Sequence, residues 1–304
     1  MMLPGIDGSN LLGFMTALGV LRLLDDDAAA RNLPQPRLLF SSSCIAAVDT
    51  PHESQDAVVE ALVAGLETRR SYFRDSLADV NKPADFSHDR FSSAVTSATG
   101  WQQYLLAGLA CNTGEEKSFE STLCAANGAS HQELIRSIRD VLALVEPGHV
   151  RAAAFQSWTR SYEVSADLRK KLNLGTRKPT LRLDPADERL YALRATNPTP
   201  ASSEYMTELG AQALAVPAFE LLPVCPLRRP ICIASRAPRA SNRVYFQWCL
   251  WGVPATLGCV RALLAIGPGD AKASRSRGAF AGFEVARVTG DKGKLSFAPT
   301  VGIW

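Results

Sequence analysis

The residues whose types and spacing best suit a chemical task are arginines and lysines in acid-poor stretches of the second half of the chain. The range Arg228–Arg243 contains five arginines and no acidic residue, among prolines that disfavour a regular helix. A guanidinium group binds two phosphate oxygens at once, so these stretches suit the backbone of a nucleic acid, and a solvated loop without a ligand is the competing interpretation. The candidate phosphate-binding residues are Arg228, Arg229, Arg236, Arg239 and Arg243, then Lys170, Lys171, Arg177 and Lys178, and finally Lys272, Arg275 and Arg277.

One histidine–aspartate pair in the sequence is of a type found in metal-dependent hydrolases. His88–Asp89 matches the dipeptide of HD phosphohydrolases, and His52, His131 and His149 are the other histidines that a metal site would recruit. In those enzymes the dipeptide lies on an apolar helix, whereas here it stands in the polar segment KPADFSHDRFSS. A surface or helix-capping role is therefore the simpler interpretation.

The sequence contains no other recognisable catalytic arrangement. The pairs Cys225/Cys232 and Cys249/Cys259 lack the close spacing of a structural zinc site. There is no GxxxxGKS/T phosphate loop, no dinucleotide fingerprint after a strand and no GxSxG elbow. We therefore expect a protein that is not an enzyme and that has no metal and no cofactor.

The formal net charge of +3 is divided unevenly along the chain. Residues 1–150 contain 11 Lys and Arg against 19 Asp and Glu, a net charge of −8. Residues 151–304 contain 22 against 11, a net charge of +11. A basic half suits a nucleic-acid partner, but mutual attraction of the two halves, or docking of an acidic subunit, also explains the asymmetry.

The element that must organise these residues is the segment Leu3–Leu24, which begins with turn-forming residues. A run of apolar residues follows, and because only one threonine and Arg22 interrupt it, we expect a helix buried on nearly all sides. Gly13 and Gly19 would allow close approach of other backbone. The acidic run Asp25–Asp27 predicts a solvated helix end.

Hydrophobic periodicity along the chain predicts an α+β fold. We expect a mainly helical, acidic half over residues 1–150 and a basic, mixed half with strands over 151–304, packed as one unit. Helices are expected over Glu53–Leu77, Gly100–Cys111, Ser130–Glu146 (capped by Ser130 with Glu133, and stopped by Pro147–Gly148), Glu204–Phe219 and Ala255–Ile266. Strands are expected over Arg37–Val48, Leu181–Asp184, Arg189–Arg194, Val244–Trp251, Phe280–Val288 and Lys294–Phe297, with a basic loop over Gly267–Gly278.

Composition places the chain among ordinary globular proteins, with 46% apolar and 21% charged residues. Its seven cysteines are an odd number, widely spaced and mostly in apolar contexts, which favours reduced thiols in a cytoplasmic protein. The apolar segment near the start is too short and too interrupted to predict a membrane span, and it lacks the basic start and cleavage site of a signal peptide.

Several segments, in order, resemble a family of CRISPR–Cas proteins. The opening PGIDGSNLLGFMTALGVLRLL is similar to the start of small subunits from type I-G (formerly I-U) loci, where a DG-x-N-PLGFLAALG-x-LR pattern recurs. Four further segments resemble that family. The chain departs from the family pattern at Leu12, which replaces a proline, and at Gln212, which stands where the family often has Asn-Arg. These segments are TLCAANGASHQELIRSIRDV, LRLDPADERLYAL, ELGAQALAVPAFELLPV and VYFQWCLWGVPATLGCVRALL.

This resemblance implies a non-catalytic subunit of an RNA-guided, Cascade-type interference complex in antiviral defence, of the large-subunit-like group or of the extension family linked to the CRISPR helicase-nuclease. Its implied partners are other effector subunits, guide RNA and/or target DNA, and the helicase-nuclease. In such complexes base pairing reads sequence while proteins hold the backbone. The alternatives are a structural adaptor that recruits the helicase-nuclease without touching nucleic acid and, less favoured, an HD-type phosphohydrolase.

Overall fold

The computed structural model confirms the predicted α+β fold, and the strand pairs among the described residues are all antiparallel. The structure describes residues 1–80, 87–112, 118–121, 123, 134–159, 166–173, 180–184, 208–225, 231–232, 235–236, 244–268, 271–289 and 295–304. The predicted strand over Arg189–Arg194, and the capping pair Ser130 and Glu133, lie outside these residues.

Helix α1 (Leu11–Ala30) is the centre of the molecule, and every residue from Leu11 to Leu24 is buried. The side chain of Asn10 caps it, since its Oδ1 accepts from the Gly13 N–H at 2.7 Å. Two expectations for this region are wrong. The residues before the helix form strand β1 (Met2–Asp7) rather than only a turn, and the helix continues through Asp25–Asp27, which is half-buried rather than solvated.

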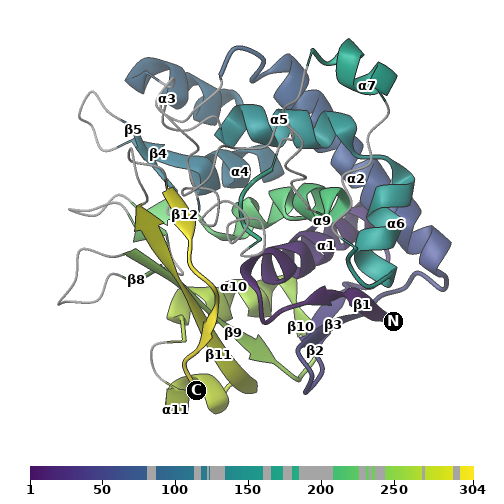
Figure 1. Ribbon diagram of the computed structural model, residues 1–304, viewed down its shortest axis with the longest axis vertical. Coiled ribbons are helices and arrows are strands. Elements are labelled where there is room, and N and C mark those ends of the chain that lie inside the picture. The colour runs from purple at the N-terminus through teal and green to yellow at the C-terminus, as the bar shows by residue number, and fades with distance from the viewer. Residues whose placement is uncertain are drawn as a thin grey trace, which may run out of the picture.

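Two sheets flank α1 in Figure 1, one below it and to its right, and the other extending from below it up its left side. The first has the order β1-β3-β2-β10, built from β1, β2 (Arg37–Phe40), β3 (Ile45–Asp49) and β10 (Ala255–Thr256). A single strand over Arg37–Val48 was expected, but the chain turns at Ser41–Cys44 and forms the hairpin β2–β3. Because β10 pairs with β2, the second half of the chain completes this sheet.

The second sheet has the order β12-β11-β9-β8, and β13 also pairs with β11. It confirms the predicted strand over Val244–Trp251 and the hairpin near the end of the sequence. Its strands are β8 (Ser235–Arg236), β9 (Val244–Trp251), β11 (Ala279–Thr289), β12 (Leu295–Phe297) and β13 (Val301–Gly302). Two small ladders pair β4 (Ala110–Asn112) with β5 (Ser118–Glu120) and β6 (Val224–Cys225) with β7 (Ile231–Cys232).

The remaining helices surround α1, mainly above it in Figure 1. They are α2 (Gln55–Asp75), α3 (His88–Ser97), α4 (Trp101–Leu109), α5 (Leu134–Leu144), α6 (Pro147–Phe155), α7 (Ala166–Lys171), α9 (Leu209–Leu214), the 3-10 helix η2 (Val216–Leu221), α10 (Leu257–Ile266) and α11 (Ala271–Arg275).

Four local predictions are corrected by these elements. Pro147 begins α6 instead of only ending the preceding helix, because proline suits the first position of a helix. The segment Leu181–Asp184 is buried coil rather than a strand, with Arg182 at a positive φ of 58°. The predicted helix over Glu204–Phe219 is divided into α9 and η2, and part of the expected loop Gly267–Gly278 forms α11.

At two glycines of α1, the backbone of another element packs directly against the helix backbone. Gly19 lies so close to α9 that an added Cβ would stand 1.7 Å from the Leu214 carbonyl oxygen. At Gly13, an added Cβ would stand 1.9 Å from the carbonyl oxygen of Asp7, at the end of the neighbouring strand β1. On another side, Phe14 stacks on Trp248, whose indole Nε1 donates to the Gly8 carbonyl at 2.8 Å. The predicted close approach at both glycines is confirmed.

Replacement of Gly19 by alanine should therefore lower the free energy of unfolding by about 1–3 kcal/mol, because the new methyl group forces α1 and α9 apart. Gly258→Ala in α10 is the matched control, since a Cβ there meets no atom within 4 Å. Its stability should be unchanged or raised by up to about 1 kcal/mol. Urea unfolding followed by circular dichroism measures both, and equal stabilities of the two variants would contradict the described packing.

Candidate functional site

Among the described residues, three of the candidate basic residues lie close together in α11 and in the turn that follows it. Lys272, Arg275 and Arg277 all have exposed side chains there. Lys272 and Arg275 are one helical turn apart, and Arg277 donates from Nη1 to the Ala273 carbonyl at 2.6 Å. Among the residues that the structure describes, none of the three basic side chains lies within ion-pair distance of a carboxylate.

The other candidate residues do not join this group. Lys170 and Lys171 are exposed on α7, which lies at the opposite end of the molecule's long axis from α11 (Figure 1). Arg236 is in strand β8, paired with Tyr245 of β9. The remaining candidates lie outside the described residues: Arg177, Lys178, Arg228, Arg229, Arg239 and Arg243. A nucleic acid that contacted α7 and α11 together would have to run the length of the protein.

The histidines considered as metal ligands have structural surroundings. His52 is buried, and its Nε2 lies 3.1 Å from Asp27 Oδ2. His149 accepts at Nδ1 from the Glu146 N–H and so helps to cap α6. Asp89 is exposed in the first turn of α3. Within the described ranges, no three His, Cys, Asp or Glu side chains are grouped so that they could hold a metal ion.

A buried ion cluster beside α1 was missed by the sequence analysis. Arg22 donates from Nε to Glu220 Oε2 at 2.7 Å, and Arg69 contacts both Glu220 oxygens, at 2.9 Å (Oε1) and 3.1 Å (Oε2) from its Nη2. Asp26 completes the cluster, with one oxygen 2.7 Å from Arg22 and the other 2.6 Å from Arg69. The side chains of Arg22, Arg69 and Glu220 are 8%, 2% and 0% exposed.

The electrostatics of this cluster favour a structural role. Burial raises the pKa of Glu220, and the two guanidinium groups beside it oppose that rise. Burial alone would lower the pKa of Arg22, but Glu220 and the aspartates around it outweigh burial and raise it. Both oxygens of Glu220 accept from arginine, so both are engaged within the cluster. Trp101 covers Arg69, whose guanidinium carbon lies 4.3 Å from the ring centroid.

A cleft of about 330 Å³ opens next to this cluster, between α1 and α2. Asp26, Arg69 and Trp101 stand on its wall, and the rest of the lining is mostly small: Leu23, Asp27, Ala30, Ala61, Ala64, Gly65 and Thr68. The carboxylates of Asp26 and Asp27 are already paired with arginines. In the part of the chain that the structure describes, every charged side chain that lines the cleft therefore already has a partner of opposite charge.

Glu220→Gln should lower the free energy of unfolding by about 3–5 kcal/mol, because it preserves the shape of the side chain but leaves two buried guanidinium groups without its charge. Glu67→Gln is the control: Glu67 pairs with Arg70 at the surface of α2, and its loss should change stability by less than about 1 kcal/mol. Chemical denaturation measures both. A loss below about 1 kcal/mol for Glu220→Gln would show that the cluster does not stabilise the fold.

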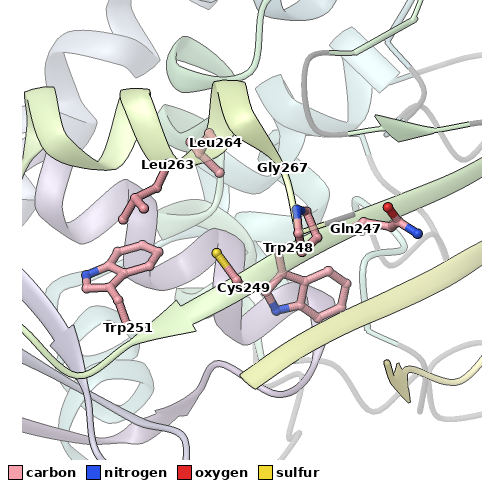
Figure 2. Close-up of a pocket in the computed structure, with 8 residues that line it drawn as sticks. Gln247, Trp248, Cys249, Trp251, Leu263, Leu264 and Gly267 are labelled. Carbon is pink, nitrogen blue, oxygen red and sulfur yellow. The ribbon is translucent and has the colours of Figure 1, made fainter. Parts of the chain in front are cut away.

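Figure 2 shows a second, much smaller void between β9 and α10, toward which the thiol of Cys249 projects. Its volume of about 10 Å³ is no more than one water molecule occupies. Trp248, Trp251, Leu263 and Leu264 line it, so the thiol has an apolar environment. Burial raises the pKa of Cys249 to about 11. The void is a packing feature of the core rather than a ligand site.

Cys249 should therefore resist alkylation in the folded protein at pH 8, whereas the exposed Cys259 should be modified readily. Since the pKa is raised on folding, this thiol contributes stability that is complete below the pKa of an unfolded cysteine, about 8.5, and is lost as the pH rises toward about 11. Mass spectrometry of alkylated peptides measures how far each cysteine is modified across this pH range. Equal modification of both cysteines at pH 8 would contradict the structure.

No protein-family model matches the chain, and no curated protein is significantly similar to it. Within the described residues, the helices are too short or too polar to cross a lipid bilayer.

Proposed function

We propose that this chain is a non-catalytic subunit of an RNA-guided, type I-G CRISPR interference complex, which acts in the cytoplasm in antiviral defence. In this role it contacts guide RNA and/or target DNA through basic surfaces of its second half, and partner subunits through other surfaces. The observation that carries the proposal is the ordered series of segments that resemble this family, considered together with where those segments lie in the fold.

Three of the resembling segments are described in full by the structure, and they contact one another in the core. The opening segment supplies β1 and α1, the ELGAQALAVPAFELLPV segment supplies α9 and η2, and the last segment supplies β9, β10 and α10. They contact one another through the Arg22–Glu220 ion pair, the approach of Gly19 to Leu214, and the hydrogen bond from Trp248 to Gly8. The resemblance therefore falls on residues that determine a fold, which supports shared architecture more than chance similarity.

The charge distribution supports contact with nucleic acid. The exposed basic side chains on α7 and α11 belong to the half of the chain with a net charge of +11. Each phosphate contact by such a side chain releases counterions, so binding should weaken steeply as salt rises. In contrast, the charged residues at the centre of the molecule are engaged with one another and are occupied in holding the fold together.

Co-expression of the tagged protein with its genomic neighbours and a CRISPR array tests this proposal. We expect effector subunits and a guide RNA to co-purify with it, and the RNA to be reduced when Arg228, Arg229, Arg236 and Arg239 are all replaced by glutamate. The control is charge reversal of Arg37 and Arg74, which are exposed arginines of the acidic half and are each paired with one aspartate.

Recovery of the protein alone would contradict the proposal. A different result would favour the structural adaptor that recruits the helicase-nuclease. In that case protein subunits co-purify in equal amounts with the wild type and the arginine variant, and no nucleic acid is bound.

A further inference from the structure

Trp304 is fixed beside the exposed basic residues of α11. Its indole Nε1 donates to the Pro268 carbonyl at 3.0 Å. Its carbonyl accepts from the Gly282 N–H at 3.0 Å, and the N–H of Ile303 donates to the Gly282 carbonyl at 2.8 Å. These bonds attach the segment after β13 to the long strand β11 and fix the position of the ring.

The side of the indole that faces β11 rests directly on backbone. A Cβ at Gly282 would stand 2.6 Å from Cε2 and 2.7 Å from Nε1 of Trp304, so glycine is required for the ring to lie there. The tryptophan is thus built into the sheet rather than left as a surface side chain. Its ring is only partly buried.

Arg275 lies over this ring, with its guanidinium carbon 5.3 Å from the ring centroid. That distance is within the range of a cation–π interaction, which orients the guanidinium group without using its N–H donors. The side chain of Arg275 is exposed and, within the described residues, its guanidinium group neither pairs with a carboxylate nor donates a hydrogen bond. Its five N–H donors therefore remain available in a fixed place.

We propose that Trp304 positions Arg275, and that Arg275 with Lys272 forms a binding site for the phosphodiester backbone of a nucleic acid. A planar guanidinium fork matches two phosphate oxygens, and Lys272, one turn earlier on the same face of α11, adds a second charge for the same or the next phosphate. This inference rests on the proposed function and names the residues of the second half that make the contact.

The proposal separates three basic residues that the sequence places in one group. Arg277 uses Nη1 to bond the Ala273 carbonyl, so part of its guanidinium group holds the end of α11. Arg275 makes no such bond in the described structure and is held by the ring instead. Loss of Arg275 should therefore weaken binding more than loss of Arg277.

The test measures binding of fluorescein-labelled single-stranded RNA, single-stranded DNA of the same sequence, and duplex DNA, by fluorescence anisotropy between about 50 and about 200 mM salt. Both the full-length purified protein and the co-purified complex are used. For Arg275→Ala, we expect the slope of log K against log salt to become less steep by about 0.7 on single strands or about 0.9 on duplex. Which probe binds most tightly identifies the source of the phosphodiester.

Two variants of Trp304 isolate its positioning role. Trp304→Ala should reproduce the change in slope seen with Arg275→Ala, whereas Trp304→Phe, which keeps an aromatic ring under the guanidinium group, should retain most of the binding. Arg74→Ala, at an exposed arginine of α2, is the control and should leave the slope unchanged. Thermal melting of each variant establishes that it is folded.

The inference is overturned if Arg275→Ala binds like the wild type at every salt concentration, or if the wild type binds none of the probes alone or in the complex. It is also overturned if folded Trp304→Phe loses as much binding as Trp304→Ala, because the ring would then not be what positions Arg275. In each of these cases, the proposed function is tested separately by whether effector subunits co-purify with the protein.

Discussion

A buried carboxylate held between two buried arginines is the interaction on which the rest of this structure depends. Glu220 comes from η2, Arg22 from α1 and Arg69 from α2, so three elements must be in register for the charges to be neutralised. Removing ions from water is costly, and close pairing with several hydrogen bonds offsets that cost only when every partner is present. The cluster therefore does more than add contacts. It selects one arrangement of these helices.

The cluster also explains how α1 can be buried over its first 14 residues, Leu11–Leu24. A helix surrounded by protein needs a partner for each polar group it carries. Arg22 finds its partners in Glu220 and in Asp26 one turn later, and the Thr16 hydroxyl bonds the Leu12 and Ala211 carbonyls. With these groups satisfied, α1 can contact both sheets and the surrounding helices.

Local signals predicted the parts of the fold that depend on local physics. The apolar run and its glycines predicted α1 as a buried helix, and the aromatic-rich segment Val244–Trp251 predicted β9. The sequence failed where a distant residue decides the outcome. Asp26 resembles a residue of a solvated helix end until Arg69, from the next helix, is placed beside it. An arginine in an otherwise apolar helix, followed by aspartates at the third and fourth positions, was the signal that could have revealed it.

The candidate site was predictable in composition but not in arrangement. Sequence identified the basic residues of α11, and it could not reveal that Lys170 and Lys171 lie at the other end of the molecule. Nor could it place Trp304 under Arg275, because that contact depends on pairing of β13 with β11 and on the bare backbone of Gly282. The functional proposal rests on sequence segments that lie in the core and on the exposed basic side chains of the second half.

The central claim is that α1 holds the fold together while α11 and Trp304 contact nucleic acid. Hydrogen–deuterium exchange of the purified complex, with and without its nucleic acid, tests this claim most directly. The account predicts slow exchange of α1 in both states and new protection over residues 271–277 and 301–304 when nucleic acid is bound. Unchanged exchange at α11, or opening of α1 when nucleic acid binds, would contradict it.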